Sequence, residues 1–181
     1  MTMNLNRPDP DIEPIPYCVI PLTQGQVALV DQEDYERVSK HKWCALYACK
    51  RYDDGVFYAV RGTRRGGKQV FTYLHRFVLN APAGLEVDHI YVKDTLDCRR
   101  ANLRLATKSQ NMANQRKARK PASSRYKGVS WHQHTKKWRA RIGVNRRNMH
   151  LGLFSSESDA ALAYNRAATL HFGQFALLNT V

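Results

Sequence analysis

Hydrophobic and polar residues alternate in short runs through the first half of the chain, a spacing that is typical of half-buried β-strands. The expected strands are two within residues 20–30 around a turn at Gly25, and further strands at 43–47, 57–61 and 70–73. Turn-forming residues at 53–55 predict a hairpin between the strands on either side of them. Residues 31–39 have the spacing of a helix with Tyr35 and Val38 facing inward, and residues 74–79 predict a second helix.

The middle of the chain predicts a strand, a loop, a second strand and a helix. These elements are expected at residues 85–89, 103–106 and 108–117. Thr107 and Gln110 have the spacing of a capping box at the start of a helix. In a capping box, the side chain of each residue accepts a hydrogen bond from the backbone N–H of the other. This order of elements brings three polar residues together, namely Asp88, His89 and Asn111.

The last part of the chain predicts a compact sheet followed by a helix. The expected strands are residues 126–131, 137–142 and 148–154. Ser155 or Ser156 is the predicted N-cap of the helix, and Gly173 is its predicted stop. A stripe of small residues along the helix suits close packing on a sheet. The fold class is therefore α+β, with a three-stranded antiparallel sheet packed on one helix at the C-terminal end.

Composition shifts divide the chain into five segments. They are a disordered, proline-rich lead (1–16), a small N-terminal α+β segment (17–80), a central strand–strand–helix unit (81–119), a basic linker (120–124) and a C-terminal domain (125–181).

The charge of the chain is strongly unbalanced. It has 29 Lys and Arg residues and only 15 Asp and Glu residues, which gives a formal net charge of +14. Residues 98–156 contain no acidic residue and hold 16 of those basic residues. A clustered positive charge predicts a polyanionic partner, and nucleic acid is the first candidate. No run of about 20 apolar residues predicts a membrane span, and no secretory signal is expected, so we expect a cytoplasmic protein.

The four cysteines lack Cys-x-x-Cys spacing, so a zinc site is not expected. A zinc site formed by Cys44, Cys49 and ligands from distant parts of the chain stays open as the alternative. The chemistry is expected at Asp88, His89 and Asn111 instead. Carboxylate and amide oxygens are ligands for Mg²⁺. A histidine that is partly neutral at cellular pH can take a proton from water. Together these residue types suit phosphodiester hydrolysis with a bound metal.

The runs Val87-Asp88-His89, Asp97-x-Arg99-Arg100-x-Asn102-Leu103-Arg104 and Ser109-Gln110-Asn111-x-x-Asn114 closely resemble the HNH homing endonucleases of phages and mobile introns. The resemblance implies a ββα-metal nuclease unit. It implies that His89 is the general base, that Asp88 and Asn111 are metal ligands, and that Asn102 orients the loop carrying the base. For His75, just upstream, a structural or DNA-positioning role is favoured.

The C-terminal segment resembles the Apetala-type (ethylene-response-factor) DNA-binding domain through Tyr126-Lys127-Gly128-Val129, Lys137-Trp138-x-Ala140-x-Ile142 and Leu151-Gly152-x-Phe154. The resemblance implies a sheet that lies in the major groove with the helix behind it. Strand alternation and the intervening turn then suggest a set of DNA contacts: Lys127, Trp131, Arg139, Arg141, Arg146, Arg147 and His150. Trp138 is equally consistent with a core residue and with a contact.

The sequence thus predicts a metal-dependent HNH DNA endonuclease that uses Mg²⁺, with Mn²⁺ as the alternative metal. Its expected partner is double-stranded DNA, which it binds as a monomer or as a dimer assembled on DNA. One active site per chain favours a nick unless two chains cooperate. Two other hypotheses stay open, a non-enzymatic DNA-binding regulator and a protein that binds structured RNA.

Overall fold

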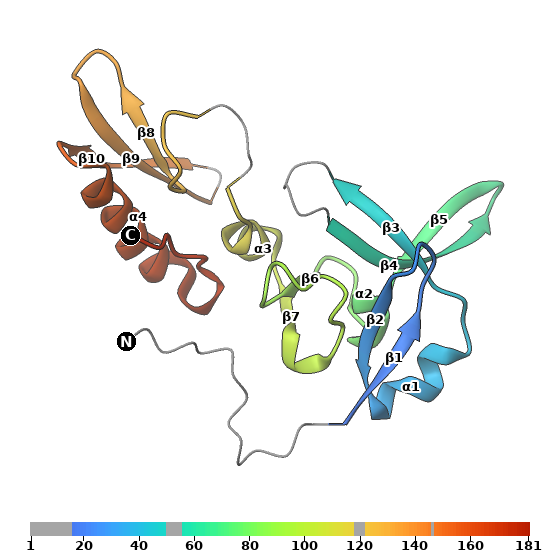
Figure 1. Cartoon of the computed structure of the whole chain (residues 1–181). Coiled ribbons are helices and arrows are strands. Elements are labelled where there is room, and N and C mark those ends of the chain that lie inside the picture. The colour runs from blue at the N-terminus through green and yellow to red at the C-terminus, as the bar shows by residue number, and fades with distance from the viewer. Residues whose placement is uncertain (1–15, 50–55, 118–121, 146) are drawn as a thin grey trace.

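The computed structural model describes residues 16–49, 56–117, 122–145 and 147–181 (Figure 1). The predicted lead falls outside the described residues except for its last position, as do the turn at 53–55, part of the predicted linker, and Arg146. The fold is a mixture of α-helices and small antiparallel sheets, which confirms the predicted α+β class. No described helix is both long and apolar enough to cross a lipid bilayer.

The N-terminal part contains two small sheets and two helices. Their elements, in chain order, are β1 (Tyr17–Pro21), β2 (Val27–Asp31), α1 (Gln32–Ser39), β3 (Cys44–Cys49), β4 (Val56–Arg65), β5 (Lys68–Tyr73) and α2 (Leu74–Val78). Strands β1 and β2 pair as one antiparallel hairpin, and the second sheet has the order β3-β4-β5. The elements follow the alternating pattern of the sequence, although β4 and β5 extend further than predicted and form a long ribbon.

One expectation for α1 is wrong. Val38 is fully buried as predicted, but the side chain of Tyr35 is 43% exposed. The neighbouring Asp34 takes the inward position, where it accepts hydrogen bonds from Arg37 and from Arg100, which lies 66 residues further along the chain. An ion pair between distant parts of the chain therefore decides which side of this short helix is buried.

The central unit consists of β6 (Glu86–His89), a short 3₁₀ turn η1 (Arg100–Asn102), β7 (Leu103–Ala106) and α3 (Lys108–Asn114). Strands β6 and β7 pair antiparallel. Thr107 and Gln110 form the predicted capping box, with both reciprocal hydrogen bonds present. Helix α3 ends at Asn114 rather than at Lys117, because the backbone of Gln115 is extended.

The N-terminal part and the central unit share one hydrophobic core. It combines Val30 of β2, Val38 of α1 and Leu74 of α2 with Val87 of β6 and Leu103 of β7. A backbone bridge between Leu29 and Asp97 also ties β2 to the loop after β6. The strands that hold the polar residues of the central unit are thus supported by the N-terminal sheets and helices.

The C-terminal domain is a three-stranded antiparallel sheet with one helix packed across it (Figure 1). Its elements are β8 (Val129–His132), β9 (Lys137–Val144), β10 (Arg147–Phe154), α4 (Glu157–Phe172) and a 3₁₀ turn η2 (Gly173–Phe175). Ser156 is the N-cap, since its hydroxyl accepts from the backbone of Ser158 and Asp159. Alanines of α4 are buried against the sheet, as the small-residue stripe predicts.

This domain contacts the central unit at the end of α3 (Figure 1). The ammonium of Lys127 donates to the backbone oxygens of Ala113 and Gln115, and the backbone N–H of Leu177 donates to the same Ala113 oxygen at 3.3 Å. Arg104 of β7 donates to the backbone oxygen of Gln174 at 2.8 Å, and its guanidinium lies 4.1 Å from the centre of the Phe175 ring. The two parts are therefore joined by specific contacts as well as by the chain.

Candidate active site

Asp88 and His89 stand at the end of β6, where the strand meets the C-terminal end of α3. In the β6–β7 pair, Asp88 lies opposite Arg104 and His89 lies opposite Leu103. Both side chains are buried, with 4% and 6% exposure. Successive side chains of a strand point to opposite faces. Even so, both residues line a single cavity of about 590 Å³.

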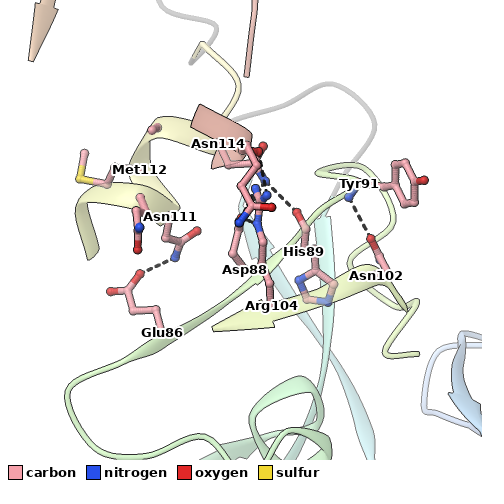
Figure 2. A network of polar contacts seen from close by, with 12 residues as sticks. Glu86, Asp88, His89, Tyr91, Asn102, Arg104, Asn111, Met112 and Asn114 are labelled. Carbon is pink, nitrogen blue, oxygen red and sulfur yellow. Dashed lines mark hydrogen bonds and ion pairs between the residues drawn. The ribbon is translucent and has the colours of Figure 1, made fainter. Parts of the chain in front are cut away.

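The carboxylate of Asp88 is held by two partners, Arg104 and Asn114, which Figure 2 draws close to it. Arg104 donates to Oδ2 at 2.8 Å, and the side-chain amide of Asn114 donates to both carboxylate oxygens at 3.0 Å. The same amide also donates to the backbone oxygen of His89 at 2.8 Å. Asn114 thereby fixes the relative positions of Asp88 and His89. A carboxylate has about four lone-pair sites, so these contacts leave it able to accept a further ligand.

The ring of His89 presents a free nitrogen in this cavity. Its Nε2 atom is buried and makes no hydrogen bond with any residue that the structure describes. Burial lowers the pKa of His89 to about 4, against a smaller opposite effect of Asp97. The imidazole is therefore neutral near pH 7, and one of its nitrogens can accept a proton.

His75 packs against His89 from α2, with 5.0 Å between the ring centres. Burial, together with the nearby His89 and Arg76, lowers the pKa of His75 to about 3. Tyr58 of β4 lies beside both rings. The N-terminal sheet and α2 therefore supply one wall of the cavity that contains His89.

Asn102 does not face the cavity but fastens the loop after His89. Its side-chain oxygen accepts from the backbone N–H of Tyr91 at 2.9 Å, as Figure 2 shows. Its amide donates to the backbone oxygens of Asp94 and Asp97. One side chain thus closes the loop of residues 90–97 at three points and holds the end of β6 that carries His89.

Asn111 lies on α3 and lines the same cavity as Asp88 and His89. Its side-chain amide donates to the carboxylate of Glu86 in a short hydrogen bond (Figure 2). Among the described residues, nothing donates to the amide oxygen of Asn111. The structure therefore gathers Asp88, His89 and Asn111 around one cavity, as the sequence leads us to expect.

The residues around this cavity fit a hard divalent cation. Asp88, Glu86 and Asn111 offer carboxylate and amide oxygens, and Mg²⁺ is commonly held by one or two carboxylates while keeping its other positions for water and phosphate oxygens. Within the described ranges, no group of three or more His, Cys, Asp or Glu side chains is placed to hold a metal ion. A cation here would therefore depend on the amide oxygen of Asn111 beside the carboxylates.

Sequence patterns assign no role to four residues of this site. Asn114 is one helical turn beyond Asn111, and Glu86 is two positions before Asp88, so a helical wheel and strand alternation could have found both. Arg104 could have been found from the pairing of β6 with β7, once the register was known. No local signal identifies Tyr58 as a neighbour of His89.

The predicted DNA contacts lie in different parts of the C-terminal domain. Paired residues share a face, and Arg139, Arg141 and His150 lie on the face away from α4, together with Lys137. Trp131 is paired with Trp138, 5.0 Å away, on the face that carries Val129. Arg147 is paired with Val144 and lies near His171 of α4. Lys127 is engaged at the end of α3, where burial lowers its pKa to about 8.

Comparison with known protein families confirms both resemblances. Residues 80–113 match the family model described as HNH endonuclease, and this range covers β6, β7 and most of α3. The relatives of this chain include Apetala-type (AP2-like) transcription factors. Both domain types bind DNA.

Two of these relatives, both from Arabidopsis thaliana, align with 80% of this chain. The ethylene-responsive transcription factor WRI1 is 26% identical over 160 residues, and the AP2-like ethylene-responsive transcription factor ANT is 26% identical over 162 residues. The alignments cover only 37% and 28% of the length of these relatives. A third relative, the AP2-like ethylene-responsive transcription factor At1g16060, is 38% identical over 58 residues.

Proposed function

We propose that this protein is a metal-dependent endonuclease that hydrolyses DNA phosphodiester bonds at the cavity around His89. The observation that supports this most directly is the buried Nε2 atom of His89, which has no hydrogen-bond partner among the described residues and lies beside the oxygen ligands Asp88 and Asn111. The match of residues 80–113 to the HNH endonuclease family supports the same proposal.

In this proposal His89 accepts the proton of the attacking water. Its neutral state near pH 7 makes it available as a base without prior loss of a proton. Asn114 holds the backbone of His89 in place, and Asn102 closes the following loop, so the ring is positioned before substrate binds. Hydrolysis of this kind leaves a 3′-hydroxyl and a 5′-phosphate, and one active site per chain favours a nick.

Asp88 and Asn111 would hold the divalent cation, with Mg²⁺ as the first candidate and Mn²⁺ as the second. The ion supplies stabilisation of the charge that develops on the scissile phosphate and the leaving oxygen. Because Arg104 and Asn114 already fix the carboxylate of Asp88, this ligand needs little reorganisation. Glu86 orients the side chain of Asn111 through the hydrogen bond between them.

The C-terminal domain would bind the DNA site through the outer face of its sheet. Arg139, Arg141 and His150 lie on this face, and arginine can recognise guanine through two hydrogen bonds in the major groove. Arg147 and Trp131 lie on the other side and are weaker candidates. Arg146 lies outside the described residues and is retained only from the sequence.

The test is cleavage of plasmid or genomic DNA with Mg²⁺ or Mn²⁺, with His89→Ala and Asp88→Asn as the variants. Loss of a general base should slow cleavage by about 10²–10⁴-fold. The matched control is His171→Ala, which removes an exposed histidine from α4, outside the cavity and away from the outer face of the sheet. If His89→Ala cuts at the wild-type rate, the proposed site is wrong.

A second candidate function is a DNA-binding regulator that does not cut. The names of the curated relatives, which are transcription factors, favour it. Sequencing the ends of DNA incubated with the wild-type protein separates the two functions. Tight site-specific binding without new ends under Mg²⁺ and under Mn²⁺ would support the regulator.

A further inference from the structure

Lys117 reaches from the end of the central unit towards the C-terminal domain. It lies shortly after the last residue of α3, Asn114. Its ammonium donates to the backbone oxygens of Ser124 and Tyr126, both at 2.7 Å. A single side chain therefore ties the end of the central unit to the backbone that leads into β8.

Lys127 makes the reciprocal contact, from the C-terminal domain to α3. The last carbonyl groups of a helix have no partner within the helix, and they form the negative end of its dipole. Helix α3, which the structure describes in full, has no basic residue in its own last turn. The ammonium of Lys127 supplies the missing donor and charge, because it donates to the backbone oxygens of Ala113 and Gln115. We call these contacts of Lys117 and Lys127 the lysine clasp.

The backbone of Lys127 is itself held in place by the C-terminal helix. Its N–H donates to the side-chain oxygen of Asn179 at 2.7 Å, and the amide of Asn179 donates back to the Lys127 oxygen at 3.1 Å. Both backbone groups of Asn179 are in turn hydrogen-bonded to the side chain of Asn165 on α4. The Lys127 side chain therefore starts from a fixed backbone position, which directs its ammonium to the end of α3.

Two further contacts join the same two parts of the protein. The backbone N–H of Leu177 donates to the Ala113 oxygen at 3.3 Å, and Arg104 donates to the Gln174 oxygen at 2.8 Å. The C-terminal domain thus contacts the central unit through residues on both sides of its sheet and helix in the sequence. These contacts hold the sheet face that carries Arg141 at one position relative to the cavity.

A flexible tether alone would leave this position poorly defined. Nine residues (118–126) lie between Lys117 and Lys127. A flexible chain of n residues has a root-mean-square end-to-end distance of about 5–6 Å × √n, which is about 15–18 Å for a segment of this length. At about 3.4 Å per base pair, that distance corresponds to about five base pairs of DNA. Without other contacts, the cavity could therefore reach several neighbouring phosphates.

We propose that the lysine clasp sets the distance between the DNA sequence that the C-terminal domain binds and the phosphodiester bond that is cut. Lys117 and Lys127 are positioning residues in this role, because neither of them lines the cavity around His89. The contacts of the clasp, and not the length of the linker, then decide which bond enters the cavity. The inference rests on the proposed function, since it requires one chain both to bind a site and to cut.

The test compares the ends of cut DNA from the wild type and from the double variant Lys117→Met, Lys127→Met. Methionine keeps most of the apolar stem of lysine but cannot donate. The full chain is incubated with Mg²⁺ and DNA that carries a site selected by the wild type from a random pool, and the new ends are sequenced. The wild type should cut mainly at one bond. The variant should spread its cuts over about five base pairs, so the share of ends at the main bond falls by up to about fivefold. An unchanged share would overturn the inference.

The matched control is Lys40→Met with Lys42→Met, which removes two exposed lysines from the N-terminal part. It should keep the wild-type pattern of ends. A binding titration without divalent metal separates the clasp from a DNA contact by Lys127. The clasp variant should keep the wild-type slope of log Kobs against log [salt]. A slope that becomes shallower by about 0.9 per lysine, together with an unmoved cut, would show that these lysines bind phosphates, and the inference would be wrong.

A second variant leaves both lysines in place and inserts a Gly-Ser-Gly-Ser segment between residues 119 and 120. The longer linker should leave the main cut where it is, and it should broaden the pattern further only when combined with the two methionine substitutions. A cut that moves or spreads after the insertion alone would show that the linker sets the distance, and would overturn the inference while leaving the endonuclease proposal intact. DNA that the wild type binds but never cuts would instead overturn the proposed function, and this inference with it.

Discussion

The cavity around Asp88 and the outer face of the C-terminal sheet carry their charged groups in opposite ways. Asp88 is buried and held by Arg104 and Asn114. Arg141 and His150 are exposed side chains on a regular sheet. Burial of a charge is tolerated only when it is paired, whereas an exposed charge costs the fold little. The first region therefore holds its charged group in a fixed geometry, whereas the second leaves its charged groups exposed to solvent.

The largest effect should follow from breaking the buried pair. Arg104→Ala removes the cationic partner of a carboxylate that is 4% exposed, and it also removes a contact to the C-terminal domain. Loss of one partner of a buried ion pair typically lowers the free energy of unfolding by about 3–5 kcal/mol. Urea denaturation measures this change. The double variant with Asp88→Asn should recover part of the loss, because it removes the unpaired charge.

The second effect is acid sensitivity. His75 and His89 have pKa values of about 3 and about 4, below the ordinary 6.5, so the unfolded chain takes up their protons first as pH falls. Stability should be complete above about pH 6.5. Between pH 6.5 and 5 it should fall by about 2 kcal/mol for each histidine. Denaturation midpoints at several pH values test this, and His75→Phe should show the smaller dependence on pH.

A smaller effect should follow from loss of the helix cap that positions Asn111 and Asn114. Thr107→Ala removes the hydroxyl that accepts from the backbone of Gln110 at 3.3 Å. Such a change typically lowers the free energy of unfolding by about 1 kcal/mol. Thr107→Ser keeps the acceptor and is the control, and both variants can be compared by urea denaturation. Equal stability of Thr107→Ala and the wild type would show that the capping box does not hold α3.

The smallest effect on stability is expected on the outer face of the C-terminal sheet. Arg141→Ala should change the free energy of unfolding by no more than about 0.5 kcal/mol, because the side chain is exposed. The same change should weaken binding to a cognate DNA site by about 1–3 kcal/mol if the guanidinium binds guanine at two points. Anisotropy titrations with site and non-site DNA measure both quantities. If Arg141→Ala lowered the free energy of unfolding as much as Arg104→Ala, the two regions would not differ in how much their charged groups stabilise the fold.

The sequence predicts best what is decided locally. Local sequence decides the capping box at Thr107, the N-cap Ser156 and the small-residue face of α4. It also decides the positions of the strands, which follow from alternation over a few residues. The gathering of Asp88, His89 and Asn111 also follows from short spacings. The individual roles of these three residues follow from the resemblance to HNH homing endonucleases.

The sequence predicts less well what distant residues decide. Tyr35 is exposed because Asp34 pairs with Arg100 from another part of the chain. The carbonyl groups at the end of α3 bind Lys127 from the C-terminal domain. Arg147 and Trp131 fall on the side away from Arg141 because pairing register assigns their faces, and register was not available from the sequence. The wall of the cavity formed by Tyr58 is likewise a result of tertiary packing.

Arg104 sets a limit on how freely the two halves of this protein can be exchanged. Its guanidinium binds Asp88 on one side and the Gln174 oxygen and Phe175 ring on the other. A chimera that replaces the C-terminal domain by another DNA-binding module would remove the contacts of Arg104 with the Gln174 oxygen and the Phe175 ring. Retargeting by domain exchange should therefore keep residues 173–177, or supply an equivalent carbonyl and aromatic ring, so that the cavity keeps its shape.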